Sequence, residues 1–197
     1  MQPPLRSERL LLRPYTLEDA STVQRLAGDR RVAEPTAAIP HPYPDGAAGS
    51  WISTHSDLFA SREGASYAVT LASTTELVGT VSLLDISPLH ARAEVGYWIG
   101  FQHWGSGYCS EAIGMLASFA EEHFGLTRLV GRCIGSNVAS ARVLKKAGFT
   151  LEGRQTKHFL HKGRYEDMLL FGRCSSTRGV ASNSSYMDPP QVQETDR

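Results

Sequence analysis

Residues 102–112 read Gln-His-Trp-Gly-Ser-Gly-Tyr-Cys-Ser-Glu-Ala, and this stretch decides the fold. It follows an apolar, aromatic segment at residues 95–99 that predicts a strand, and it opens a helical pattern that runs to about His123. A turn of this kind presents backbone N–H groups at the positive end of a helix. Gly105 and Gly107 have no Cβ, so the main chain there can approach a phosphate closely. The stretch therefore predicts a site for a ligand that carries a pyrophosphate.

The spacing of the glycines excludes two common phosphate-binding sequences. A dinucleotide-binding fold has G-x-G-x-x-G after its first strand, whereas here Ser110 takes the third glycine position and the turn lies in mid-chain. A P-loop has G-x-x-x-x-G-K-[ST], and this string does not occur in the sequence. What the stretch does contain is Q-x-x-G-x-G, formed by Gln102, Gly105 and Gly107.

A second motif follows the next predicted strand. Residues 137–149 read Asn-Val-Ala-Ser-Ala-Arg-Val-Leu-Lys-Lys-Ala-Gly-Phe, which predicts a short helix that ends at a glycine C-cap. Asn137 and Ser140 are three positions apart, so we expect them to share one face of this helix.

Together these motifs resemble the coenzyme A loop and the following N-x-x-S helix of the GNAT superfamily of N-acetyltransferases. The resemblance is to its RimJ/RimL-like branch, which includes ribosomal-protein N-terminal acetyltransferases. The opening at residues 6–14 and the ending at residues 165–171 resemble the same branch, so the likeness covers residues 5–174. It implies an α/β domain with a mostly antiparallel, partly parallel sheet of about six or seven strands and about four flanking helices.

The resemblance also implies a reaction. An acetyl group would pass from acetyl-CoA to a primary amine by direct attack on the thioester, without a metal. The acceptor would be a protein N-terminal α-amine or a small-molecule amine. One alternative is a non-catalytic acyl-CoA-binding or regulatory module on the same fold. Another is a nucleotide-binding protein that uses the loop for a different diphosphate.

The expected cofactor-binding groups follow from the motifs. Backbone N–H groups of residues 104–109 would hold the pyrophosphate, and the amides of residues 96–99 would polarise the thioester carbonyl. Asn137 would bind the pantetheine arm. We interpret the side chains of Trp104 and Cys109 as packing groups at a tight turn, so we expect these two residues to bind the cofactor through their backbone N–H groups. The expected set is Tyr97, Trp98, Ile99, Gln102, Trp104, Gly105, Ser106, Gly107, Tyr108, Cys109, Asn137 and Ser140.

The catalytic residues are less directly marked. Many members of the superfamily have a tyrosine acid seven positions after the helix asparagine, but this chain has Leu144 there. The resemblance suggests that Ser140, one turn earlier on the same helix face, hydrogen-bonds the departing thiolate. It suggests Glu94 as the base that accepts the amine proton, with a water relay as the alternative. His41 and Tyr43, in a proline-rich loop, would line the acceptor pocket together with Glu94.

Composition limits the other possibilities. The chain has 197 residues, with 20 Lys and Arg against 20 Asp and Glu, so no strong field favours nucleic acid. No run is long and apolar enough to cross a membrane, and we expect a cytoplasmic protein, with a homodimer suggested by relatives. Three cysteines at wide spacings predict neither a disulfide framework nor a zinc site.

The periodicity predicts one domain at residues 1–174 and a disordered tail at residues 175–197, which is rich in Ser, Gln, Pro and Asp. A loop is expected at residues 28–46, where prolines forbid a regular helix. The expected strands are residues 8–15, 67–72, 77–86, 94–99, 128–134, 149–160 and 164–173, and the expected helices are residues 16–27, 47–62, 108–123 and 137–147.

Overall fold

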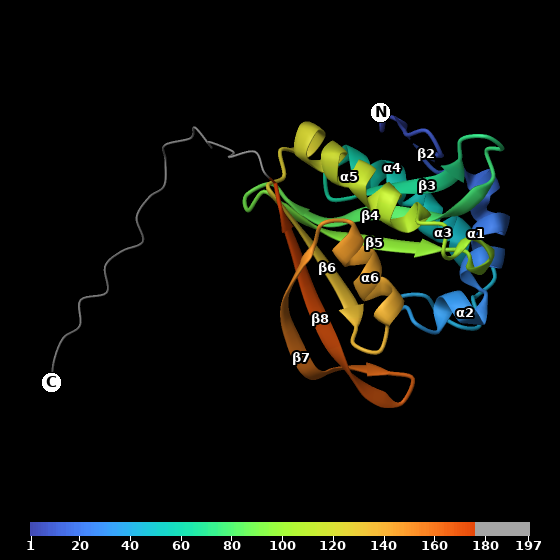
Figure 1. The fold of residues 1–197 in the computed structure, drawn as a ribbon. Coiled ribbons are helices and arrows are strands. Elements are labelled where there is room, and N and C mark those ends of the chain that lie inside the picture. Colours follow the sequence, from blue (N-terminus) through green and yellow to red (C-terminus); the bar gives the residue numbers. More distant parts are fainter. Residues whose placement is uncertain (176–197) are drawn as a thin grey trace, which may run out of the picture.

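One mixed sheet organises the chain, with helices on both of its faces (Figure 1). The computed structural model describes residues 1–175, so most of the predicted tail lies outside the described residues. The strand order is β1-β2-β3-β4-β5-β6-β8-β7. Within this part of the chain, β5 and β6 form the one parallel pair, and the other neighbours are antiparallel. The predicted fold class is therefore confirmed.

The strands are β1 (Leu5–Arg6), β2 (Leu10–Arg13), β3 (Ala65–Leu71), β4 (Leu77–Ser87), β5 (Arg92–Ile99), β6 (Arg128–Ile134), β7 (Thr150–His161) and β8 (Arg164–Cys174). The helices are α1 (Ala20–Ala27), α2 (Arg30–Ala33), α3 (Ala47–Ser53), α4 (His55–Ala60), α5 (Tyr108–Phe124) and α6 (Val138–Lys146), and two 3-10 turns are η1 (Leu17–Asp19) and η2 (Phe101–His103).

The element predictions were wrong in three places, each for a local reason. The expected loop at residues 28–46 contains α2, because the Asp29 carboxylate accepts the Arg31 N–H at 2.9 Å and caps it. The expected helix at residues 47–62 breaks at Thr54, whose hydroxyl donates to the Trp51 carbonyl at 2.9 Å. The sheet also has an additional short strand, β1, ahead of the predicted first one.

Alternation along the strands divides the core between the two faces of the sheet. Leu10 and Leu12 belong to the larger cluster, on the face that α5 and α6 cover (Figure 1). Trp98 packs against the smaller cluster, which α1 and α3 form on the opposite face. Tyr97, its neighbour on β5, packs against the larger one. The side chains of consecutive residues of β5 therefore point to opposite faces of the sheet.

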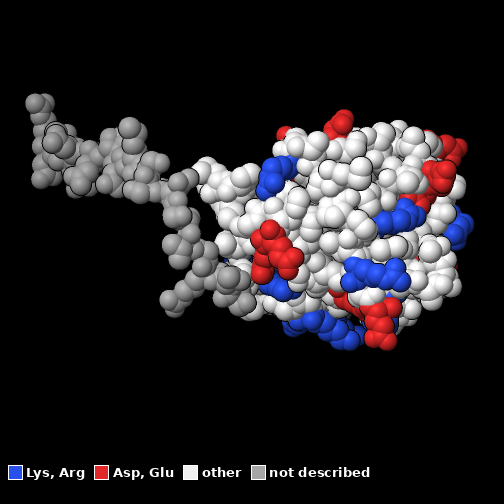
Figure 2. Space-filling view, turned by 90° about the horizontal axis from the view of Figure 1, so that it is seen from above, with Lys and Arg blue, Asp and Glu red and all other residues white. Residues whose placement is uncertain are grey.

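The surface carries charges of both signs. On the face seen in Figure 2, acidic and basic side chains are interspersed among uncharged ones. None of the helices described is long and apolar enough to span a bilayer. Within residues 1–175, no three His, Cys, Asp or Glu side chains group together as metal ligands would.

His55 is a buried histidine whose burial makes the stability of the fold depend on pH. Its side chain packs against Trp51 at 4.4 Å and Tyr15 at 5.4 Å between ring centroids, and only 6% of the residue is exposed. Neither ring nitrogen has a hydrogen-bond partner among the described residues. Burial lowers its pKa from 6.5 to about 4. The folded protein therefore holds a neutral imidazole at pH values where the unfolded chain is already protonated.

We expect this site to destabilise the fold as the pH falls. Between pH 6.5 and about 4 only the unfolded chain takes up the proton, so the free energy of unfolding should fall by about 3 kcal/mol. Urea unfolding of wild type and His55→Phe across this range measures the effect, and His55→Phe should remove that part of the slope. His90→Gln, at an exposed histidine, is the control and should keep it. Equal slopes in wild type and His55→Phe would contradict the assignment.

Candidate functional site

The sheet opens between β5 and β6. Their parallel pairing ends at Val95 and Gly131, although β5 continues to Ile99 and β6 to Ile134, and the two strands diverge (Figure 1). On its other edge, β5 stays paired with β4 as far as Ile99. Residues 96–99 thus have no strand partner on the β6 side among the described strands. Backbone N–H and C=O groups need partners, so this edge can bind a polar ligand.

The glycine turn lies immediately beyond the end of β5. Gly105 and Gly107 both have φ of +79°, which side-chain-bearing residues rarely adopt. Gly107 is the N-cap of α5, and no side chain caps the first turn of this helix. The first N–H groups of a 17-residue helix therefore remain available to an anion. Of the other residues predicted here, Gln102 lies exposed in η2, and Ser106 lies between the two glycines. Tyr108 and Cys109 are the first two residues of α5.

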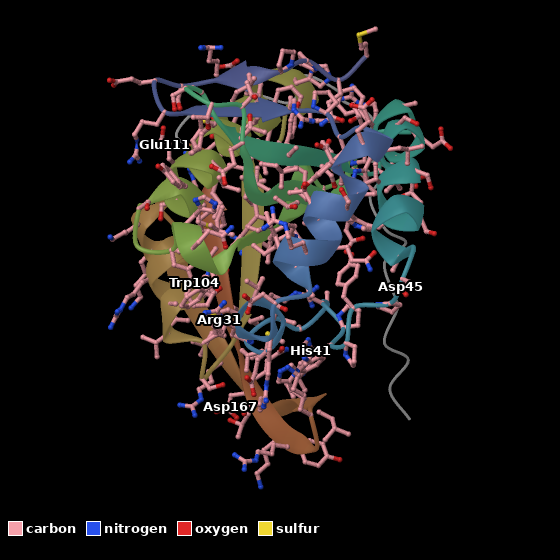
Figure 3. All side chains as sticks on the ribbon, turned by 90° about the vertical axis from the view of Figure 1, so that its right-hand side faces the viewer. Arg31, His41, Asp45, Trp104, Glu111 and Asp167 are labelled. Carbon is pink, nitrogen blue, oxygen red and sulfur yellow. The ribbon has the colours of Figure 1, made fainter. Side chains whose placement is uncertain are left out.

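Trp104 is more exposed than we expected for a packing residue. Its side chain is 45% exposed, and its indole N–H donates to the Ile99 carbonyl at 2.7 Å. This bond fixes the turn against the end of β5. Arg31 of α2 lies over the Phe101 ring at 3.6 Å, and Figure 3 shows Arg31 and Trp104 close together on the side where the sheet opens.

Arg9 and Ser7 hold the glycine turn from the turn between β1 and β2. The Arg9 Nε donates to the Glu111 carboxylate at 2.8 Å, and its Nη1 donates to the Ser106 carbonyl at 3.1 Å. Ser7 Oγ donates to the other Glu111 oxygen at 2.7 Å. Sequence reasoning missed these residues as part of the site. Glu111 follows the turn directly, but nothing local to residues 6–14 indicates where their side chains point.

Ser140 lies on the α6 side of the opening, beside Tyr97. Its Oγ is 2.8 Å from the Tyr97 hydroxyl. Burial raises the pKa of Tyr97 above its ordinary value, so this hydroxyl keeps its proton. Burial also raises the pKa of Cys133, against an opposing hydrogen bond with Ser140. Leu144, at the position of the expected tyrosine acid, is fully buried, and Gly131 leaves room for it under β6.

Cys109 is a packing residue with a protonated thiol. Burial raises its pKa to about 12, and its side chain packs against the larger core cluster. The positive end of α5 therefore does not produce a thiolate at neutral pH, in agreement with the interpretation of Cys109 as a small residue that fits a tight turn.

Asn137 caps α6 instead of lying within it. Its Oδ1 accepts the Ser140 N–H at 3.0 Å, and its Nδ2 donates to the Pro35 carbonyl at 2.9 Å. The amide thus has protein partners at both ends, and its predicted contact with a pantetheine arm stays a prediction.

Glu94 and Ser140 do not lie on the same face of the sheet. Glu94 is in the paired part of β5, opposite Val130, and by alternation it faces away from Tyr97. Both of its carboxylate oxygens accept hydrogen bonds from Arg132, one of them at 3.0 Å.

The proline-rich loop also contributes to this side of the molecule. His41 Nδ1 lies 3.2 Å from the Gly28 carbonyl, whereas Tyr43 packs half-buried against the smaller core cluster. At the C-terminal end of α2, the Glu34 carbonyl accepts hydrogen bonds from His161 at 2.8 Å and from Lys162 at 3.2 Å, both at the β7–β8 turn. Figure 3 shows His41 and Asp167 in the lower half of the molecule.

Comparisons with known proteins point to one family. The model of the acetyltransferase (GNAT) domain matches residues 9–150. The uncharacterized N-acetyltransferase YoaA of Bacillus subtilis is 31% identical over 180 residues, which cover 87% of this chain and 96% of that protein. The ribosomal-protein-serine acetyltransferase of Escherichia coli is 35% identical over 98 residues, which cover 50% of this chain and 55% of that protein.

A solved structure of RimL, a ribosomal α-N-protein acetyltransferase in complex with coenzyme A, superimposes with a TM-score of 0.79. The alignment has 21% identity and covers 87% of this chain and 98% of RimL. At this identity the likeness establishes the fold.

Proposed function

Because this chain belongs to the GNAT acetyltransferase family, we propose that it moves an acetyl group from acetyl-CoA to a primary amine. The acceptor is a protein N-terminal α-amine or a small-molecule amine. The observation that carries the proposal is the opening between β5 and β6, which has the glycine turn just beyond the end of β5 and Ser140 of α6 beside Tyr97. The amine nitrogen attacks the thioester carbonyl, the C–S bond breaks, and the sulfur leaves as a thiolate.

The cofactor would bind mainly through the main chain. The N–H groups of the glycine turn and of the first turn of α5 supply fixed donors for the pyrophosphate. Arg9 supports the turn, because its guanidinium bonds the Ser106 carbonyl and the Glu111 carboxylate. The unpaired edge at residues 96–99 provides donors for the thioester carbonyl, where negative charge develops in the transition state.

Ser140 would donate a hydrogen bond to the departing thiolate. Tyr97 keeps its proton and lies closer to Ser140 Oγ, at 2.8 Å, than to the Ser140 carbonyl, at 3.4 Å. Either oxygen can donate in this pair, and in the proposed arrangement the Tyr97 O–H donates to Ser140 Oγ, which leaves the serine hydrogen free to point away from Tyr97. That hydrogen can then be offered to the sulfur.

Glu94 is the proposed acceptor of the amine proton. Because Arg132 already donates to both of its oxygens, the proton would reach the remaining lone pairs most simply through a water. A water relay that does not involve Glu94 is the alternative.

The test is acetyl-CoA-dependent thiol release with two amine probes, a synthetic peptide with an N-terminal serine and spermidine. We expect at least one probe to release free coenzyme A and to gain an acetyl group by mass spectrometry. Trimethylamine is the control, because a tertiary amine has no N–H to lose and forms no stable amide. Tight acetyl-CoA binding without transfer to a wider panel of primary amines would favour the non-catalytic acyl-CoA-binding module instead.

A further inference from the structure

The side-chain amide of Asn137 joins two segments that are far apart in the sequence. Its oxygen accepts the Ser140 N–H at 3.0 Å, and its nitrogen donates to the Pro35 carbonyl at 2.9 Å, across 102 residues. Both bonds belong to one planar group. The position of Pro35 relative to the N-terminus of α6 is therefore fixed by a rigid connection a few atoms long.

Pro35 is also the first residue of a stiff loop. Residues 35–44 contain Pro35, Pro40, Pro42 and Pro44, and each proline ring fixes its own φ angle. A shift at Pro35 is therefore transmitted along the loop more readily than it would be in a flexible chain. The far end is anchored separately, because the Asp45 carboxylate accepts from Gln24 at 2.8 Å and Tyr43 packs against the smaller core cluster. His41 lies between these two anchors.

The surrounding contacts support the same segment. The carbonyl before Pro35, that of Glu34, accepts from His161 and from Lys162. In Figure 1, α2 and the chain that follows it lie beside the N-terminal end of α6. The start of the loop is thus held by α6 and by the β7–β8 turn, on the side where β5 and β6 separate.

We propose that Asn137 is a positioning residue for the amine acceptor. Its oxygen orders the turn that carries Ser140, and its nitrogen holds the loop that carries His41 at a fixed distance from that turn. The acceptor pocket and the thiolate site are thereby set relative to one another. The kinetic part of this inference rests on the proposed acetyltransferase function, and the structural part does not.

Three substitutions distinguish the effects of the two hydrogen bonds that the Asn137 amide makes. Asn137→Asp keeps an oxygen that caps α6, and it replaces the nitrogen that donates to Pro35 with a second oxygen. Asn137→Ser also keeps a capping oxygen but is too short to reach Pro35. Asn137→Ala loses both bonds. Asn137→Asp and Asn137→Ser should therefore behave alike, and Asn137→Ala should in addition lose stability through the missing cap.

For Asn137→Asp and Asn137→Ser we expect the KM for the reactive amine probe to rise about fivefold or more, which is the loss of roughly one hydrogen bond. Acetyl-CoA affinity by calorimetry should stay within about twofold, a difference of less than 1 kcal/mol. Hydrogen exchange of residues 36–43 should quicken in both variants, measured on the acetyl-CoA complex and on the free protein. The exchange measurement requires no catalysis.

The outcomes are distinguishable. Weaker acetyl-CoA binding with an unchanged amine KM would overturn the inference and assign Asn137 to the pantetheine arm. Unchanged exchange at residues 36–43 in both capped variants would also overturn it, because the loop would then not depend on the Pro35 bond. If wild type acetylates none of the amines tested, the proposed function fails, and the exchange result alone decides whether Asn137 positions the loop.

Discussion

Gly107→Val should weaken acetyl-CoA binding at least about 100-fold, close to 3 kcal/mol. Gly107 has φ of +79° and is the N-cap of α5, so a β-branched residue there forces the turn out of its left-handed conformation. The N–H groups proposed to bind the pyrophosphate would then point elsewhere, and their contacts to the cofactor would be lost. Calorimetry with acetyl-CoA measures the effect directly.

Gly125→Val is the matched control. Gly125 has φ of +68° and is the C-cap of the same helix, with no atom within 4 Å of an added Cβ. Backbone strain should therefore be similar in the two variants, while only Gly107 lies at the end that binds an anion. We expect Gly125→Val to lose stability but to keep its affinity. If Gly107→Val is folded and binds as wild type does, the turn is not the pyrophosphate site.

Local chemistry explains what could be predicted from the sequence. Gly105 and Gly107 require positive φ at a strand-to-helix turn, and the β6 strand at Arg128–Ile134 was predicted with the bounds that the structure has. Prolines marked the loop at residues 28–46, but not the short helix within it. The break at Thr54 depends on the hydrogen bond from its hydroxyl to the Trp51 carbonyl in the preceding turn, and hydrophobic periodicity does not predict such a bond.

The contacts that complete the site join distant segments. Arg9 reaches Glu111, Tyr97 reaches Ser140, and Asn137 reaches Pro35, over 102, 43 and 102 residues. No local propensity encodes such pairings, because each depends on the sheet order and on which strand face a side chain occupies. The sequence therefore predicted Ser140 and Tyr97 as site residues but not the contact between their hydroxyls, and it gave catalytic roles to Ser140 and Glu94 although the two face opposite sides of the sheet.

Ser140→Ala should lower kcat by about tenfold or more, at least about 1.4 kcal/mol of barrier, with little change in acetyl-CoA affinity. The alanine leaves the thiolate without the donor that the serine hydroxyl supplies. Tyr97→Phe removes one oxygen and should lower kcat about fivefold, because Ser140 Oγ then loses the partner that we propose directs its hydrogen. Tyr67→Phe is the control, since it removes a buried hydroxyl from β3 on the same sheet face.

The double variant separates orientation from packing. If Tyr97 acts through Ser140, adding Tyr97→Phe to Ser140→Ala should have almost no further effect on kcat, because the hydroxyl that Tyr97 orients is already missing. Additive losses would instead mean that Tyr97 acts on its own, through packing or through direct contact with the substrate. A kcat for Ser140→Ala within about threefold of wild type, less than 1 kcal/mol, would show that Ser140 does not stabilise the departing thiolate. Leu144, at the position of the expected tyrosine acid, has no proton to give, so the proposal rests on the Ser140 hydroxyl and on its contact with Tyr97.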